Sequence, residues 1–126
     1  MRKSLAIIIA LSAMSFAQPA VAEPLGSGLF SGASCHATSG RVTVTKQNGQ
    51  YVIDLGDDFS FDGAPDPYVS LGAGNKPLEG GLDAELGSNK GAQRYVIDAT
   101  AALDGATQVI IWCKKYAVPL GVAAIQ

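Results

Sequence analysis

Three side chains in this sequence could bind a metal ion or exchange electrons: the thiols of Cys35 and Cys113 and the imidazole of His36. They are the only cysteines and the only histidine among 126 residues. The single tryptophan, Trp112, and Lys114 flank Cys113. A lysine near a thiol favours the reactive thiolate, and an indole ring offers a π-face to a flat cofactor. One hypothesis is therefore a redox-active Cys113, with His36 and Trp112 as candidate cofactor contacts.

The small number of such residues excludes several kinds of site. The sequence lacks the Cys-x-x-Cys-His motif of c-type haem, the Cys-x-x-Cys motif of thioredoxin-like sites and the four thiolates of an iron–sulfur cluster. Blue-copper sites need two histidines. Cys35 and His36 are adjacent, so on an extended chain they point to opposite faces, which disfavours joint zinc ligation. We predict no metal site, and with one histidine a stand-alone enzyme is the weaker expectation.

Residues 1–22 have the pattern of a secretory signal peptide. Two basic residues precede an apolar segment from Leu5 to Met14, and Ala20–Val21–Ala22 fits the small-x-small cleavage pattern. The apolar segment is too short to span a bilayer, and no second apolar stretch of membrane length follows it. We predict cleavage after residue 22, export to the periplasm or the exterior, a flexible lead-in at 23–28 and one domain at 29–126.

The charge balance limits the classes of partner. The chain carries 9 basic and 11 acidic side chains, and loss of the two basic residues in the leader makes the net charge −4. Nucleic acids and anionic membranes both require a basic surface. We therefore expect no nucleic-acid partner and no membrane span, and we look for protein partners.

The two cysteines allow a second interpretation of Cys113. In an oxidising compartment a pair of cysteines permits one intramolecular bridge, Cys35 with Cys113. That bridge would span 77 intervening residues, and the chain-entropy model gives a loop of this length about 4–5 kcal/mol of stabilisation. Small exported domains commonly need such a link. The sequence thus leaves Cys113 either as half of a structural disulfide or as a redox sulfur.

A β-hairpin at Arg41–Leu55 is the clearest local prediction. Apolar and polar residues alternate on both sides of Asn48–Gly49, the preferred two-residue hairpin turn. Pairing Gln47 with Gln50 places the apolar residues of both strands on one face. Turn chemistry and side-chain pattern therefore agree on one register.

The remaining elements are also expected to be strands. Val109–Tyr116 is short and rich in β-branched and aromatic residues, which predicts a strand buried on both faces, with Cys113 on the side of Val109 and Ile111. Strand signals recur about every ten residues, a helical turn is expected within 99–105, and Gly72–Gly81 is interpreted as a surface loop. We predict an all-β fold, an antiparallel sandwich or partly closed barrel of about 7–9 short strands, with no long helix in the mature chain.

Several short motifs occur together in an order that is typical of one family. They are Phe30-x-Gly32, His36-x-x-Ser39-Gly40, Asp58–Phe59, Pro65–Asp66 with Val69-x-Leu71, Gly91-x-Gln93-x-Tyr95, Val109–Ile110–Ile111–Trp112–Cys113–Lys114 and Gly121-x-Ala123. In this order and company they resemble the DM-thirteen domain, from about Phe30 to Ile125. The Trp-Cys-Lys segment is the most specific of the motifs.

The resemblance implies a β-rich extracytoplasmic domain with a role in electron transfer. The cysteine of Trp-Cys-Lys, here Cys113, would act as a thiol or as a haem ligand, which makes haem the one cofactor to test. Such domains often accompany DOMON domains, so the implied partner is a redox protein or a DOMON-type domain. The alternative is a non-redox binding or adhesion module in which Cys35–Cys113 is purely structural and the surface at 63–81 recognises the partner.

Overall fold

The computed structural model describes residue 6, residues 8–10, residues 12–13 and residues 22–126. Most of the predicted signal peptide (1–22) lies outside these residues, so its cleavage and the export of the chain stay predictions. Within the described part, no helix has the length and apolarity that crossing a bilayer requires.

The described chain is built from strands, as predicted. Eight strands have six residues or more and three have two, and the one helical element is a 3₁₀ turn. In chain order they are β1 (Glu23–Leu29), β2 (Ser31–Gly32), β3 (Thr38–Ser39), β4 (Arg41–Gln47), β5 (Gln50–Leu55), β6 (Ser60–Phe61), β7 (Pro67–Ala73), β8 (Lys76–Glu85), β9 (Gln93–Asp98), η1 (Ala101–Leu103), β10 (Gln108–Cys113) and β11 (Val118–Ala124).

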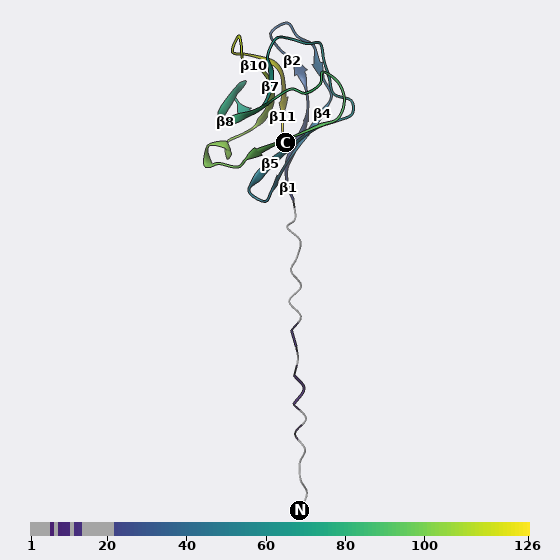
Figure 1. Cartoon of the computed structure of the whole chain (residues 1–126), viewed down its shortest axis with the longest axis vertical. Helices are drawn as coiled ribbons and strands as arrows, with labels where there is room; N and C mark the ends of the chain where they lie inside the picture. The colour runs from purple at the N-terminus through teal and green to yellow at the C-terminus, as the bar shows by residue number, and fades with distance from the viewer. Residues whose placement is uncertain (1–5, 7, 11, 14–21) are drawn as a thin grey trace, which may run out of the picture.

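Two antiparallel sheets form a sandwich (Figure 1). The first has the order β1-β4-β5-β9 and the second β2-β11-β10-β7-β8, while β3 and β6 form a small separate pair. Alternate residues of both sheets meet in one core, which Phe59 and Phe61 complete from the connecting segment. At one edge, Ser27 and Gln126 exchange two backbone hydrogen bonds of 3.1 Å. This contact joins β1 to the end of the chain without closing a barrel.

The predicted β4–β5 hairpin is confirmed in its register. Gln47 pairs with Gln50, and Asn48 and Gly49 have φ of +52° and +73°, as a two-residue hairpin turn requires. The inward-facing valines of β4 are buried, as are Tyr51, Ile53 and Leu55 of β5. The sequence pattern therefore determined this element completely.

Strand β10 lies in the middle of its sheet, between β11 and β7. Val109 and Ile111 face the core with Cys113, and Ile110 on the opposite face is also fully buried. The prediction of a strand buried on both faces is confirmed there. Burial decreases along the outer face, because Trp112, the next residue on that face, is half-buried.

The segment predicted as a flexible lead-in at 23–28 is strand β1, paired antiparallel with β4. The glycines that suggested flexibility serve close packing. A Cβ at Gly28 would lie 2.0 Å from the carbonyl oxygen of Ala124, and one at Gly26 would lie 2.8 Å from the backbone of Gln126. Glycine is required here because backbone approaches backbone at this edge.

The surface loop predicted at Gly72–Gly81 is also wrong, since most of it belongs to the β7–β8 hairpin. The turn is Gly74–Asn75, with φ of +61° and +62°. A Cβ on Gly72 would lie 2.2 Å from the carbonyl oxygen of Lys76. The glycine-rich composition therefore reflects a tight turn and close strand contact, with a register irregularity in the pairing of β7 with β8.

Candidate functional site

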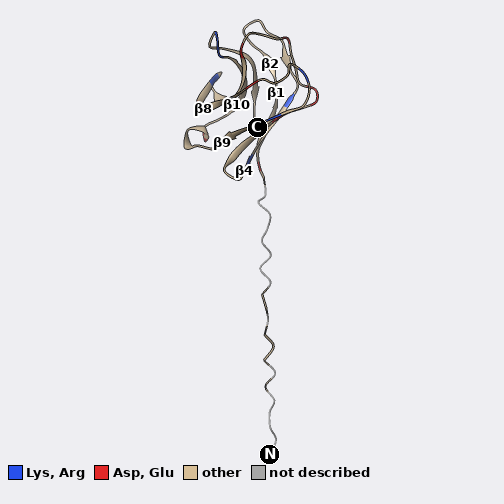
Figure 2. Cartoon of the chain, viewed as in Figure 1, with Lys and Arg blue, Asp and Glu red and all other residues tan. Residues whose placement is uncertain are grey.

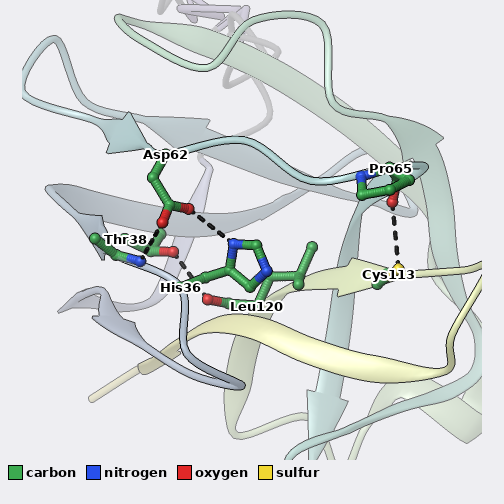
Figure 3. Close-up of polar contacts among 7 residues, drawn as sticks. His36, Thr38, Asp62, Pro65, Cys113 and Leu120 are labelled. Carbon is green, nitrogen blue, oxygen red and sulfur yellow. Dashed lines mark hydrogen bonds and ion pairs between the residues drawn. The ribbon is translucent and has the colours of Figure 1, made fainter.

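Cys113 is the last residue of β10, and its thiol lies at the end of the core. The residue is 1% exposed, and its Sγ donates a hydrogen bond to the carbonyl oxygen of Pro65 over 3.2 Å (Figure 3). Pro65 itself is exposed. The sulfur is therefore enclosed, yet only one residue separates it from the surface.

The backbone around this sulfur is fixed from several directions. Cys113 pairs with Pro67 of β7 on one side and with Val118 of β11 on the other. The Cys113 carbonyl accepts the N–H of Ala117 at 2.8 Å, and the N–H of Lys114 donates to the Asp66 carbonyl at 3.1 Å. Asp66 reaches that position with a φ of +55°. The sulfur thus has a defined position at the end of a central strand.

Lys114, the lysine expected to favour the thiolate, has its ammonium group over an aromatic ring. Its Nζ lies 5.0 Å from the centre of the Tyr68 ring. Trp112 pairs with Tyr68 in the β10–β7 register and therefore belongs to the same outer face. Because neighbouring strand residues point to opposite faces, Trp112 and the Cys113 sulfur lie on opposite faces of the sheet.

The predicted Cys35–Cys113 disulfide is not formed in the structure, where both cysteines are free thiols. Cys35 is exposed in the turn that follows β2, and β11 runs between β2 and β10. Strands on either side of a common neighbour are about 9.5 Å apart, whereas a disulfide tolerates Cα separations up to about 7 Å. The register places Cys113 and the turn that carries Cys35 at the same end of the sheet, on either side of β11.

His36 is held in a polar contact with the segment after β6. Its Nδ1 lies 2.9 Å from Oδ1 of Asp62, and the Asp62 Oδ2 accepts the N–H of Ala37 at 3.0 Å (Figure 3). The hydrogen bond from Ala37, followed by that from His36, lowers the pKa of Asp62 below its ordinary value. The arrangement orients the imidazole and leaves Nε2 as the nitrogen that could meet a ligand.

One segment, residues 61–66, contacts both His36 and Cys113. It holds His36 through the Asp62 carboxylate and Cys113 through the Pro65 carbonyl (Figure 3). The sequence alone indicated no site role for Asp62, and Pro65 occurred only within a family motif. The Pro65 contact uses a backbone carbonyl that every residue type carries, so no sequence signal could have identified it. The Asp62 contact depends on pairing between β3 and β6, which are two residues long.

The residues do not fit the haem that the resemblance allowed. A haem ligand must present its donor atom to an open planar space, but the Cys113 sulfur is enclosed and already bonded to Pro65. No pocket is found among the described residues, and they contain no group of three or more His, Cys, Asp or Glu side chains placed for a metal ion. No step is therefore assigned to haem.

Comparison with known families gives one match. The model of the family described as Electron transfer DM13 matches residues 29–125, from the end of β1 to the residue after β11. No curated protein and no solved structure shows significant similarity to the chain.

Proposed function

Because the chain belongs to the electron transfer DM13 family, we propose that it is an exported electron-transfer domain whose redox centre is the Cys113 thiol. The observation that carries this proposal is the enclosed sulfur at the end of β10, which donates to the Pro65 carbonyl. It is the one thiol of the domain held in a defined position by the core. Its surroundings favour electron exchange over direct bond exchange with another molecule.

Burial decides between two kinds of thiol chemistry. Thiol–disulfide exchange needs direct attack by one sulfur on another and therefore access to the sulfur atom. Cys113 offers no such access, because Pro65 and the core cover it. Transfer of a single electron needs proximity to a partner but no new bond, so an enclosed sulfur can take part in it.

The proposed step is balanced by a protein partner. Oxidation removes one electron and the thiol proton from Cys113, and leaves a sulfur-centred radical. The electron goes to an oxidised one-electron carrier protein, and the proton leaves to solvent on the side of Pro65, which is an exposed residue. Reduction by the same class of partner restores the thiol. A redox protein or a DOMON-type domain would serve as that carrier.

Redox titration of the purified domain with a one-electron oxidant tests this proposal. Wild type and the matched control Cys35→Ala should each give up one electron per molecule at the Cys113 step, with a transient sulfur radical visible by electron spin resonance. Cys113→Ser keeps a donor for Pro65 but should lose this step. Equal titration of Cys113→Ser and wild type would overturn the assignment, provided that near-ultraviolet circular dichroism shows both folded.

Export is tested separately by cell fractionation and mass measurement of the mature chain. We expect a chain that starts at Glu23 and is found outside the cytoplasm. A chain that retains residues 1–22 in the cytoplasm would contradict this part of the proposal and leave the redox part to its own test.

A further inference from the structure

We propose that the tip of the β10–β11 hairpin is the surface on which an acidic partner protein docks. We call it the hairpin-tip surface and define it by Tyr68, Trp112, Lys114, Lys115 and Tyr116. The proposal rests on the proposed electron-transfer function, because it names where and with what kind of partner the electron is exchanged.

The surface has an aromatic centre. Trp112 lies in register between Tyr68 of β7 and Pro119 of β11, and all three are half-buried. Beyond the strand end, the side chain of Tyr116 is 62% exposed. Tryptophan and tyrosine are enriched in the contact centres of protein interfaces. The two aromatic side chains that flank the strand end are therefore suited to contact another protein.

The surface also has a cationic rim. Lys114 lies with its Nζ 5.0 Å from the centre of the Tyr68 ring, and Lys115 with its Nζ 5.4 Å from the centre of the Tyr116 ring. Both lysines are exposed, and within the described part neither forms an ion pair. Figure 2 shows this basic tip projecting from the sandwich.

The charge of this tip differs from that of the protein as a whole. Lys114–Lys115 is the one pair of adjacent basic residues after residue 22, in a chain whose net charge is −2. The nearby acidic residues are Asp66, whose carbonyl binds the Lys114 N–H, and Glu85, which pairs with Tyr68. A local positive surface on an anionic protein steers an oppositely charged partner toward that one place.

The position of the surface fits its proposed use. Trp112 and Lys114 are the covalent neighbours of Cys113. A partner on this surface therefore contacts the residues on both sides of the one that carries the sulfur. Electron-transfer contacts are weak and bury less than about 1,200 Å² in total. A hairpin tip with a few aromatic and cationic side chains is suited to a contact of that size.

An anionic membrane is the less favoured occupant. Binding to anionic lipid takes clusters of about 4–8 basic residues, whereas this tip has two. The anionic remainder of the protein would be repelled by such a membrane.

The single tryptophan makes docking measurable without any redox chemistry. Poly-L-glutamate serves as the acidic polypeptide probe, and Trp112 fluorescence reports its binding in the full mature chain. The test variant is Lys114→Gln/Lys115→Gln. The control is Lys46→Gln/Lys90→Gln, which removes the same charge elsewhere and includes another lysine stacked on a tyrosine ring, at 5.6 Å from Tyr51.

We expect poly-L-glutamate to change the fluorescence of wild type and of the control pair, and high salt to abolish the change. The Lys114/Lys115 variant should lose it. Ferricyanide then probes electron transfer. At low salt, the rate at which ferricyanide oxidises Cys113 should be about five- to tenfold lower in the Lys114/Lys115 variant than in wild type, and unchanged in the control pair.

Each outcome decides one proposal. Equal probe binding by the Lys114/Lys115 variant and wild type would overturn the docking surface, as would binding to phosphatidylserine vesicles in place of the acidic polypeptide. Probe binding that depends on both lysines, together with no oxidation of Cys113 in any variant, would support the surface and reject the redox centre.

Discussion

The surroundings of Cys113 and Cys35 differ although both lie at the same end of one sheet. Cys113 is the last residue of a central strand, its side chain faces the core, and its thiol donates a hydrogen bond to a backbone carbonyl. Cys35 lies in an exposed turn where Ser34 and Cys35 both have positive φ. The same side chain is a fixed part of the core in one place and an open surface thiol in the other. Position in the sheet thus separates two sulfurs that composition alone would have paired.

The largest expected difference between the two cysteines is in thiol reactivity. Iodoacetamide should alkylate Cys35 at least about a thousandfold faster than Cys113, because Cys113 must wait for a local opening that costs about 4 kcal/mol or more. Peptide mass spectrometry after timed alkylation measures both rates in one sample. Similar rates would show that the Pro65 segment does not cover the sulfur.

The turn that carries Cys35 depends on a glycine contact. A Cβ at Gly32 would lie 1.9 Å from the carbonyl oxygen of His36. Gly32→Ala should therefore lower the free energy of unfolding by about 2–4 kcal/mol. Gly105→Ala is the control, since a Cβ there meets nothing within 4 Å. Urea unfolding measures both, and equal midpoints would contradict the described packing of the turn.

Replacement of each cysteine by alanine should have a smaller effect, and an unequal one. Cys113→Ala leaves a cavity in the core and should cost about 1–2 kcal/mol of unfolding free energy. Cys35→Ala should change it by less than about 0.5 kcal/mol, because its side chain is exposed and free. A loss of several kcal/mol in Cys35→Ala without reductant would instead indicate a bridge.

The smallest expected effect concerns the acid side of the pH profile. The pKa of Asp62 is lowered in the folded protein, so its contribution to stability is present above the ordinary aspartate value and is lost as the pH falls through the lowered value. Asp62→Asn should therefore be less stable than wild type at neutral pH, and the two should converge in strong acid. Urea midpoints over a pH series test this, and a constant difference at every pH would contradict it.

The sequence predicted those features that depend on local chemistry. The Asn48–Gly49 turn, the register of its hairpin and the two faces of Val109–Cys113 follow from side-chain type and spacing, and all three are confirmed. The family resemblance is confirmed too, over residues 29–125. These predictions needed no knowledge of distant contacts.

The features that sequence reasoning missed depend on what a segment packs against. Gly26 and Gly28 suggested flexibility. Their lack of a Cβ instead lets the backbone of Ala124 and Gln126 pack closely against β1. The predicted disulfide is not formed in the structure, where both cysteines are free thiols and β11 lies between β2 and β10. The hydrogen bond from the Cys113 thiol to the Pro65 carbonyl could not be predicted, because every residue type carries the same backbone carbonyl.

The contact between Ser27 and Gln126 has a consequence for how the domain would work inside a larger assembly. Strand β11 runs from the hairpin tip to the end that bonds to β1, so Gln126 lies beside β1 at one pole and Lys114–Lys115 lies at the other. Seven strand residues separate the poles by about 23 Å. A tether or neighbouring domain joined at either terminus would therefore attach at the pole opposite the hairpin-tip surface. That surface would stay accessible to a carrier protein.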